Sequence, residues 1–230
     1  TLKNRYPNVR ILTWKKEFNY SAINNFAVRE ARGEYLLFLN NDVEIITESW
    51  LEEMLQLCQQ KDVGMAGAKL YYPDDTIQHA GVVVGLGGVA AHVLCKLPRD
   101  AEGYMGRLRC VQEISAVTAA CMMVKTSVFK AVGGFDEELK VAFNDIDLCM
   151  KVRKYGVKIV FTPYAELYHY ESKSRGMEDT PEKQLRFSRE VNCFRRKWER
   201  ELLKGDPYYN PNLTLNNTDC SLRKQEKNGD

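Results

Sequence analysis

Three short polar segments of the chain combine residue types that could support group-transfer chemistry, and the first is Asn40-Asn41-Asp42. It directly follows the apolar run 35–39. A carboxylate and two carboxamides at the end of a buried strand can bind a divalent cation through oxygen atoms while the cation binds a phosphate. A turn that leads into the next helix explains the same triplet equally well.

The second segment contains Asp145 and the third contains His169. Asn144 is expected at the N-cap of a helix, which places Asp145 in the first turn. There the helix dipole favours an ionised carboxylate, as a general base requires, although ordinary helix stabilisation uses the same placement more often. His169 follows a predicted strand and could bind a metal, but most isolated histidines are hydrogen-bonded structural residues. His79 is expected in a structural turn.

These segments need a scaffold, and the alternation of apolar runs along the chain predicts one of strands and helices. Strands are expected over residues 9–14, 35–39, 63–70, 116–124 and 157–161. Helices are expected over residues 21–32, 49–58 (with a Ser49–Glu52 capping box), 126–132, 145–155 and 180–202. The pattern predicts a doubly wound α/β sheet, in which the uninterrupted apolar run 35–39 is typical of a parallel strand covered on both faces. Ligands of such sheets collect beyond the carboxyl ends of the strands.

The chain has 230 residues, which is long enough for a domain with a hydrophobic core. Residues 1–205 are expected to form this domain. The sequence starts at Thr1 rather than Met and is interpreted as a fragment. Residues 206–230 are expected to form a C-terminal extension with a largely disordered tail.

The composition limits the class of partner and the location. The chain has 33 Lys and Arg against 31 Asp and Glu, a net charge of +2, which argues against nucleic acid as a partner. Seven cysteines without a C-x-x-C pair are typical of reduced thiols in a cytosolic protein. No apolar run reaches the roughly 20 residues of a membrane-spanning helix. The predicted location is the cytoplasm, with peripheral attachment to the inner face of the membrane as a further option.

The order of these segments, together with a Gly-Gly-Phe-Asp loop before Asp145, resembles the family-2 glycosyltransferases of GT-A fold. The similarity is greatest to the bacterial enzymes that build O-antigen and related cell-surface polysaccharides. It spans most of residues 20–210 and is carried by GEYLLFLNND (33–42), VGGFDEEL (132–139), FNDIDLCMKVRKYG (143–156) and AELYHYES (165–172). The resemblance implies a GT-A-like doubly wound mixed sheet flanked by helices, incomplete at the N-terminus, with a C-terminal helical extension.

The resemblance also implies roles for individual residues. Asn40-Asn41-Asp42 corresponds to the family's D-x-D motif, so Asp42 would bind the metal on the donor diphosphate, with Asn40 and Asn41 beside it. Asp145 corresponds to the catalytic base and His169 to a later metal ligand. The implied cofactor is Mn²⁺ or Mg²⁺. The implied partners are a nucleotide-sugar donor and a saccharide or lipid-linked saccharide acceptor.

Further residues are matched to the donor and acceptor sites. Asn25 lies near a donor-contacting Asn of the family, and the expected acceptor-site residues are Gly134, Phe135, Asp136 and Asn144. Lys173 and Arg175 follow His169 and could form a mobile loop that closes on the diphosphate. A solvated basic loop explains these two residues equally well.

The sequence departs from the family pattern in three ways. Asn40 and Asn144 stand where an Asp and a Glu are usual, so the site carries two fewer negative charges and a lower metal affinity is expected. A Q-x-x-R-W motif is missing, which argues against a processive membrane synthase. The family's first strand, first helix and second strand, with the acidic residue that reads the nucleotide base, would lie before Thr1.

Three hypotheses follow for the function. The first is a metal-dependent inverting glycosyltransferase that acts in cell-surface polysaccharide synthesis. The second is a non-catalytic, truncated glycosyltransferase fragment that cannot bind donor. The third is a glycoside hydrolase with Asp42 and Asp145 as its carboxylate pair, which His169 and the strand-end position of Asp42 argue against.

Overall fold

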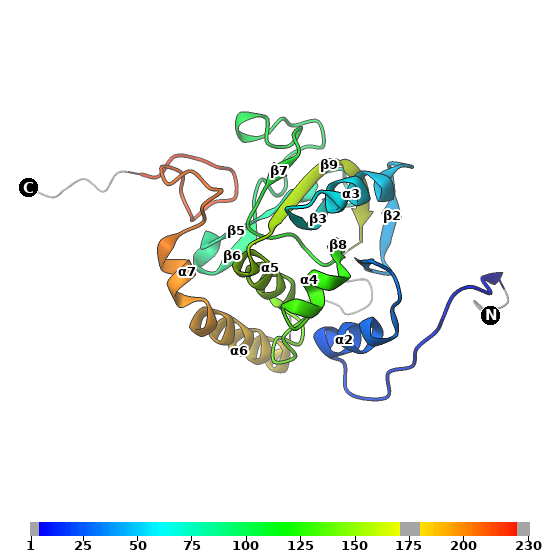
Figure 1. Cartoon of the computed structure of the whole chain (residues 1–230). Coiled ribbons are helices and arrows are strands. Elements are labelled where there is room, and N and C mark those ends of the chain that lie inside the picture. The colour runs from blue at the N-terminus through cyan, green and yellow to red at the C-terminus, as the bar shows by residue number, and fades with distance from the viewer. Residues whose placement is uncertain (1–4, 171–179, 225–230) are drawn as a thin grey trace, which may run out of the picture.

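The computed structural model describes residues 5–170 and 180–224, which form a mixed α/β fold around one large sheet (Figure 1). The main path of this sheet has the strand order β1-β8-β3-β9-β2. Its strands are β1 (Tyr35–Leu39), β8 (Cys121–Lys125), β3 (Val63–Tyr71), β9 (Lys158–His169) and β2 (Val43–Ile45). Two short strands join from the side: β4 (Ile77–His79) pairs with β3, and β7 (Gln112–Glu113) pairs with β9. A separate two-stranded sheet contains β5 (Val82–Val84) and β6 (Ala90–His92).

Helices cover both faces of the main sheet, as the doubly wound prediction requires. On one face, α3 (Trp50–Gln59) packs on alternate residues of β3, β8 and β9. The other face carries α2 (Tyr20–Glu30), α4 (Thr126–Ala131), α5 (Asn144–Tyr155) and α6 (Pro181–Lys197), and α7 (Glu199–Lys204) follows α6. Two single 3₁₀ turns, η1 (Leu86–Gly88) and η2 (Tyr104–Gly106), interrupt the loops.

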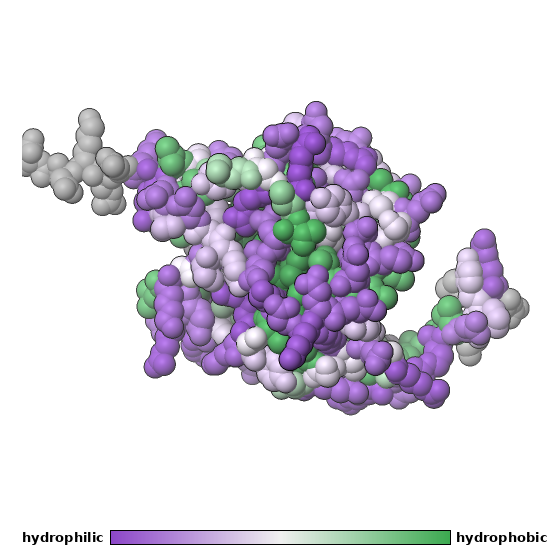
Figure 2. All heavy atoms as spheres, turned by 45° about the horizontal axis from the view of Figure 1, so that its top comes forward, coloured by the Kyte–Doolittle hydropathy of each residue, from purple (hydrophilic) through white to green (hydrophobic). Residues whose placement is uncertain are grey.

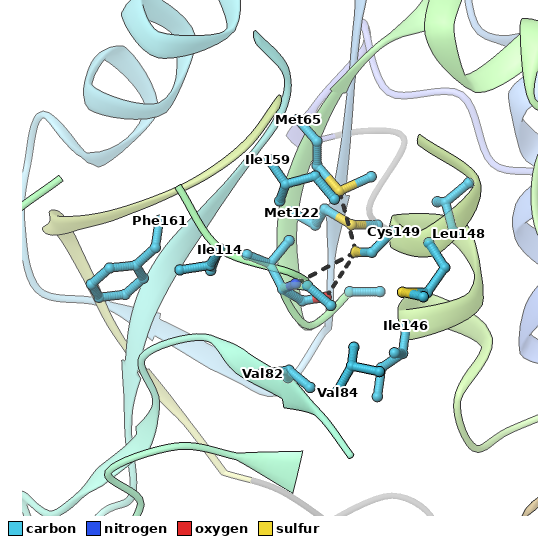
Figure 3. Close-up of a cluster of buried hydrophobic side chains, with 14 of the residues drawn as sticks. Met65, Val82, Val84, Ile114, Met122, Ile146, Leu148, Cys149, Ile159 and Phe161 are labelled. Atoms are coloured by element: carbon cyan, nitrogen blue, oxygen red, sulfur yellow. Dashed lines mark hydrogen bonds between the residues drawn. The ribbon is translucent and has the colours of Figure 1, made fainter. Parts of the chain in front are cut away.

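The core under α5 shows how tightly the helix sits on the sheet (Figure 3). Cys149 Sγ lies 3.5 Å from Met65 Sδ, and the backbone N–H of Val117 donates to the same sulfur at 3.4 Å. Gly67 of β3 makes room for Val117, because a Cβ atom at position 67 would lie 2.3 Å from the valine Cγ1. Burial raises the pKa of the Cys149 thiol, so this cysteine is a packing residue.

On the face of the molecule in Figure 2, a narrow strip of hydrophobic residues lies among hydrophilic ones.

The strand over residues 35–39 forms as predicted, but its direction relative to its neighbour differs. Leu36 and Phe38 enter the core on the α5 face, while Tyr35 and Leu37 pack against the core on the α3 face, so both faces are covered. However, β1 pairs antiparallel with β8, and the predicted parallel pairing is wrong. The mixed sheet is confirmed, with β3 and β9 as its parallel pair in the described residues. An apolar run reports burial and carries no information about strand direction.

The β9 strand runs further than predicted. We expected it to end before Pro163, because proline cannot donate a ladder hydrogen bond. The register between β3 and β9 instead shifts from Gly67↔Phe161 to Lys69↔Glu166, which forms a bulge that contains Pro163. The strand then continues to His169. The bulge therefore accommodates the proline and extends the strand to the predicted metal ligand.

Several local predictions are wrong. Residues 9–14 form no strand; Val9 and Ile11 are about half exposed, and β-branched residues need a packing partner to form one. Ser49 makes no side-chain capping bond at the start of α3, so the capping box is not formed. The N-cap of α5 is Phe143, in the left-handed region with φ 61°, and Asn144 is the first helical residue.

The C-terminal part also differs from its prediction. The long helix is interrupted at Trp198, whose backbone leaves the helical region between α6 and α7. Residues 206–224 are packed on the domain: the N–H of Leu94 donates to the Thr218 carbonyl, and the side chains of Leu213 and Cys220 are buried. The predicted disordered tail is therefore wrong for this part of the extension.

Candidate active site

The two predicted metal ligands, Asp42 and His169, lie side by side. Asp42 stands in the turn after β1, and His169 is the last residue of β9, where it pairs with Val43 of β2. The backbone N–H of Tyr170 donates to the Asp42 carbonyl at 2.8 Å, which holds the two segments together. His169 Nε2 lies 3.3 Å from Asp42 Oδ1 and 3.1 Å from Asn40 Nδ2.

The hydrogen bonds around His169 define its tautomer. Gln78 Oε1 can only accept, and it lies 2.7 Å from His169 Nδ1, so the proton of the neutral ring is on Nδ1. His169 Nε2 then carries a lone pair, which accepts from Asn40 Nδ2. Asp42 Oδ1 is buried and accepts no hydrogen bond from the residues that the structure describes. An imidazole nitrogen and a carboxylate oxygen that face each other as acceptors fit a cation bound between them.

The protein supplies few ligands for such a cation. Among residues 5–170 and 180–224, no group of three or more His, Cys, Asp and Glu side chains could hold a metal ion. One carboxylate, one imidazole and a neighbouring carboxamide leave most of an octahedral shell to other oxygens. This arrangement fits a cation that takes its remaining ligands from water and from the phosphates of a substrate.

Asp145 occupies the first turn of α5, as predicted, and its carboxylate is held by two backbone groups. Oδ2 accepts from the N–H of Ala119 at 3.1 Å and Oδ1 from the N–H of Ile146 at 2.8 Å. The hydroxyl of Tyr20 donates to the Ala119 carbonyl at 3.2 Å. Burial and, next, the charge of Asp145 raise the pKa of Tyr20, so the phenol stays protonated beside the carboxylate.

A single backbone segment, residues 118–120, connects Asp145 with the Asp42–His169 pair. The N–H of Ala119 binds Asp145, and the carbonyl of Ala120 accepts from the N–H of Asn40 at 3.0 Å. Ala119 and Ala120 are consecutive residues, whose Cα atoms lie about 3.8 Å apart. Both halves of the site are therefore attached to the same short stretch of backbone. The structure thus brings the predicted base and the predicted metal ligands to one region, at the end of β1 and the start of β8.

The predicted acceptor loop is fixed mainly by Asn25. Its Oδ1 accepts from the N–H of Phe135 at 2.9 Å, and its Nδ2 donates to the Phe135 carbonyl at 3.0 Å. Gly134 adopts φ +66°, and a Cβ there would lie 2.7 Å from Asn25 Oδ1. The two hydrogen bonds engage both polar atoms of the Asn25 side chain. The structure therefore places Asn25 as a support of the loop; a contact with the donor stays a prediction.

The other predicted site residues have varied surroundings. The Phe135 ring is buried against Phe38 and Phe129, so any contact with an acceptor is left to the loop backbone. Asp136 forms an ion pair with Lys197 at 2.5 Å. Although burial acts in the opposite direction, the hydrogen bond from Lys197 lowers the pKa of Asp136.

Two predicted residues of the site lie at its margin, and two lie outside the described residues. Asn144 is buried, and its Nδ2 donates to the Val141 carbonyl at 3.0 Å, whereas Asn41 is exposed in the turn after β1. Lys173 and Arg175 are outside the described residues.

Sequence reasoning missed three residues that contact this region: Gln78, His79 and Glu190. Gln78 and His79 are buried in β4 rather than in the predicted turn. The Glu190 carboxylate on α6 accepts from the N–H groups of Val141 and Ala142 at 3.0 and 2.9 Å, just before α5. No local pattern marks these residues, because each contacts a segment far away in the sequence.

The geometry can be compared with known proteins. A sequence profile described as "Glycosyltransferase like family" matches residues 7–190. The chain belongs to this glycosyltransferase-like family. It is 56% identical over 215 residues to protein y4gI of Sinorhizobium fredii, which covers 93% of this chain and 24% of that protein. It is 42% identical over 225 residues to the O-antigen biosynthesis protein RfbC of Myxococcus xanthus, which covers 97% of this chain and 17% of that protein.

A third relative of this glycosyltransferase-like chain is the N-acetylglucosaminyl-diphospho-decaprenol L-rhamnosyltransferase of Mycobacterium tuberculosis. The identity is 24% over 193 residues, covering 76% of this chain and 62% of the relative. The chain thus spans less than two thirds of each of these three relatives.

Solved structures support the GT-A fold. The mannosyltransferase PcManGT of Pyrobaculum calidifontis, in complex with GDP-Man and Mn²⁺, gives a TM-score of 0.57 at 14% identity, covering 86% of this chain and 49% of that one. GalNAc-T7 with UDP, GalNAc and Mn²⁺ gives a TM-score of 0.63 at 12% identity, covering 88% and 39%. At these identities the likeness concerns the fold alone. In the described residues, no helix has the length and apolar character to cross a membrane.

Proposed function

We propose that this chain is the catalytic domain of a metal-dependent inverting glycosyltransferase. It would move a sugar from a nucleotide-sugar donor to a saccharide acceptor in cell-surface polysaccharide synthesis. The observation that carries this proposal is the Asp42–His169 pair, in which a buried carboxylate oxygen faces an imidazole lone pair at 3.3 Å. Asp145 is attached to the same backbone segment through Ala119.

Each residue has a defined task in the reaction. Inversion requires the acceptor hydroxyl to attack the anomeric carbon from the side opposite the departing nucleoside diphosphate. Asp145 takes the hydroxyl proton, and the N–H groups of Ala119 and Ile146 orient its carboxylate for this step. Asp42 and His169 would hold the cation, which would supply positive charge to the leaving diphosphate. Asn40, whose Nδ2 lies 3.1 Å from His169 Nε2, would give up this hydrogen bond when the cation takes the imidazole lone pair.

The names of the similar proteins suggest the substrate classes. PcManGT and GalNAc-T7 were solved with GDP-Man and with UDP, and both with Mn²⁺. We therefore propose a nucleoside-diphosphate sugar as donor and Mn²⁺ as metal, with Mg²⁺ as the alternative. The name of RfbC favours a role in O-antigen synthesis, and that of the N-acetylglucosaminyl-diphospho-decaprenol rhamnosyltransferase favours a saccharide acceptor that is linked to a lipid diphosphate. A cytoplasmic location stays a prediction.

The decisive experiment compares wild type with Asp145→Asn in a transfer assay and in donor-nucleotide calorimetry with Mn²⁺. Loss of a general base lowers kcat by about 10² to 10⁴. Binding of UDP or GDP should change less than twofold, because Asp145 does not contact the proposed metal. Glu48→Gln, which removes a charge from an exposed carboxylate, is the control and should behave like wild type.

Other outcomes would support other functions. A wild type that neither binds the nucleotide nor transfers sugar would favour a non-catalytic fragment. An unchanged kcat in Asp145→Asn would show that Asp145 is not the general base. Sugar release in the absence of nucleotide and metal would favour a glycoside hydrolase.

A further inference from the structure

The short strand β4 carries two buried polar residues, Gln78 and His79, that have no task in the proposed reaction. Gln78 is 5% exposed and His79 is fully buried. Side chains of this kind are costly to bury unless their polar atoms are hydrogen-bonded. The partners of both residues lie in the candidate active site, one on each side of β4.

Gln78 binds His169 at two points. Its Oε1 accepts from the imidazole Nδ1–H at 2.7 Å, and its Nε2 donates to the His169 backbone carbonyl at 3.2 Å. The first bond fixes the tautomer and the second fixes the backbone from which the ring projects. Together they direct the Nε2 lone pair toward Asp42. Hydrogen bonds of this type raise the basicity of a metal-binding imidazole and lower its freedom to rotate.

His79 holds the other half of the site through Thr118. Its Nε2 accepts from the Thr118 N–H at 3.4 Å, so the proton of the neutral ring is on Nδ1. His79 Nδ1 lies 2.9 Å from His92 Nδ1, to which it donates this proton. Burial, and then the neighbouring His92 and His169, lower the pKa of His79, which keeps the ring in the neutral form that these bonds need.

Thr118 begins the segment 118–120 to which both Asp145 and Asn40 are bound. A shift of this backbone would move the carboxylate of Asp145 relative to the Asp42–His169 pair. Adjacent residues of one strand thus contact the two halves of the site. Their separation is fixed by a single peptide unit, the stiffest spacer that the chain offers.

We propose that the Gln78–His79 dipeptide is a positioning unit that holds His169 and the segment 118–120 at a constant separation, so that the metal and the base act on the same substrate. The proposal rests on the proposed glycosyltransferase function for its kinetic consequences. The tautomers it requires are independent of that function. They are Nδ1–H for His169 and His79, and Nε2–H for His92.

The first test is direct observation of the three imidazole tautomers by long-range ¹H–¹⁵N NMR on the full chain without metal. The chain contains only three histidines, so single substitutions assign the signals. We expect Gln78→Met, which keeps the side-chain length but removes both bonds, to change the His169 signals and leave those of His79 and His92. Gln78→Glu keeps an acceptor for Nδ1–H and should retain the His169 tautomer.

The second test measures the effect of Gln78 on metal binding separately from the effect of His79 on turnover. Gln78→Met should weaken Mn²⁺ binding, measured by calorimetry, by about 10- to 100-fold, and Gln78→Glu should recover most of it. His79→Leu should lower kcat at least tenfold with Mn²⁺ affinity within twofold of wild type. His79→Gln, whose carbonyl can accept from the Thr118 N–H, should recover much of kcat. Thermal unfolding of all four variants separates these effects from lost stability.

Three outcomes would overturn the proposal. The wild-type His169 signals could report Nε2–H. All four variants could change only the melting temperature. Gln78→Glu could fail to recover the Mn²⁺ binding that Gln78→Met loses, and His79→Gln could fail to recover the kcat that His79→Leu loses. If wild type shows the expected tautomers but no transfer, the function proposed above fails and the positioning of His169 by Gln78 stands.

Discussion

Asp42 Oδ1 lies 3.3 Å from His169 Nε2, and in the neutral ring with its proton on Nδ1 both of these atoms are acceptors. Two acceptors at this distance repel each other unless a cation or a proton separates them. The turn after β1 and the end of β9 are nevertheless held together by the bond from the Tyr170 N–H to the Asp42 carbonyl. When the ring is neutral, the pair therefore carries a local electrostatic cost, which a cation bound between the two atoms would remove.

This cost makes the effect of Asp42→Asn depend on the metal. Without metal, the substitution removes the repulsion between the carboxylate and the imidazole lone pair, so the free energy of unfolding should stay equal or rise by about 1 kcal/mol. With Mn²⁺ at 100 times its Kd, wild type should gain about 2.7 kcal/mol, and the variant should gain almost nothing. Urea unfolding with EDTA and with Mn²⁺ measures both. An Asp42→Asn variant that Mn²⁺ stabilises as much as wild type would remove Asp42 from the metal site; Glu48→Gln is the charge control.

Gly134→Ala tests how closely Asn25 holds the predicted acceptor loop. A Cβ at Gly134 would lie 2.7 Å from Asn25 Oδ1 and 3.0 Å from the Phe129 ring, whereas a Cβ at Gly133 meets nothing within 4 Å. Both glycines have positive φ, so Gly133→Ala should cost only the left-handed strain of about 1 kcal/mol. Gly134→Ala should cost about 1 to 3 kcal/mol more. Equal losses in the two variants, measured by urea unfolding, would mean that the loop moves freely away from Asn25.

Asp147 should matter for stability rather than for chemistry. It is fully buried, two residues after Asp145, and Trp198 Nε1 and Lys197 Nζ bind its Oδ1, each at 2.8 Å. Removing one partner of such a buried pair costs about 3 to 5 kcal/mol. We expect Asp147→Ala to lower the free energy of unfolding by this amount. The kcat per folded molecule should change far less than in Asp145→Asn; an equal loss in both would assign Asp147 a part in the reaction.

The Asp136–Lys197 ion pair predicts a pH dependence of stability. The Asp136 pKa is lowered from 3.8 in the folded state. A lowered carboxyl pKa means that the unfolded chain binds the proton more readily, so the contribution is present above about pH 4 and lost as pH falls through the folded pKa. Both side chains are partly exposed, so we expect about 1 kcal/mol or less. The curves of wild type and Asp136→Asn, measured by urea unfolding from pH 3 to 6, should converge at the acid end; parallel curves would contradict the pairing.

Local patterns in the sequence predicted much of the fold. The apolar runs located β1 and β3, and the stop at Gly156 located the end of α5. The direction of β1 could not be predicted, because burial on both faces is the same for either direction. The length of β9 depended on the bulge at Pro163, which is set by pairing with β3 and leaves no mark in the sequence.

The residues of the candidate site also divide into those that the sequence could predict and those that it could not. Asp42, Asp145 and His169 stand at strand ends or in the first turn of a helix, and they could be proposed because the order of their segments resembles the family pattern. Gln78 and His79 could not, because the contact of Gln78 with His169 spans 91 positions and that of His79 with Thr118 spans 39. Asn25 was expected near the donor but binds the loop at Phe135, since a polar side chain on a helix takes whichever partner tertiary packing brings to it.

The bulge in β9 also decides which face of the sheet the last part of the strand presents. Side chains of a regular strand alternate between the two faces, but Val160 and Ala165 lie five positions apart and both pack in the cluster under α3, so the extra residues reverse the alternation. A straight strand in place of the bulge would turn the imidazole of His169 to the opposite face while leaving every residue of the Asn40-Asn41-Asp42 turn in place. The proposed metal site thus depends on a segment that contributes no ligand.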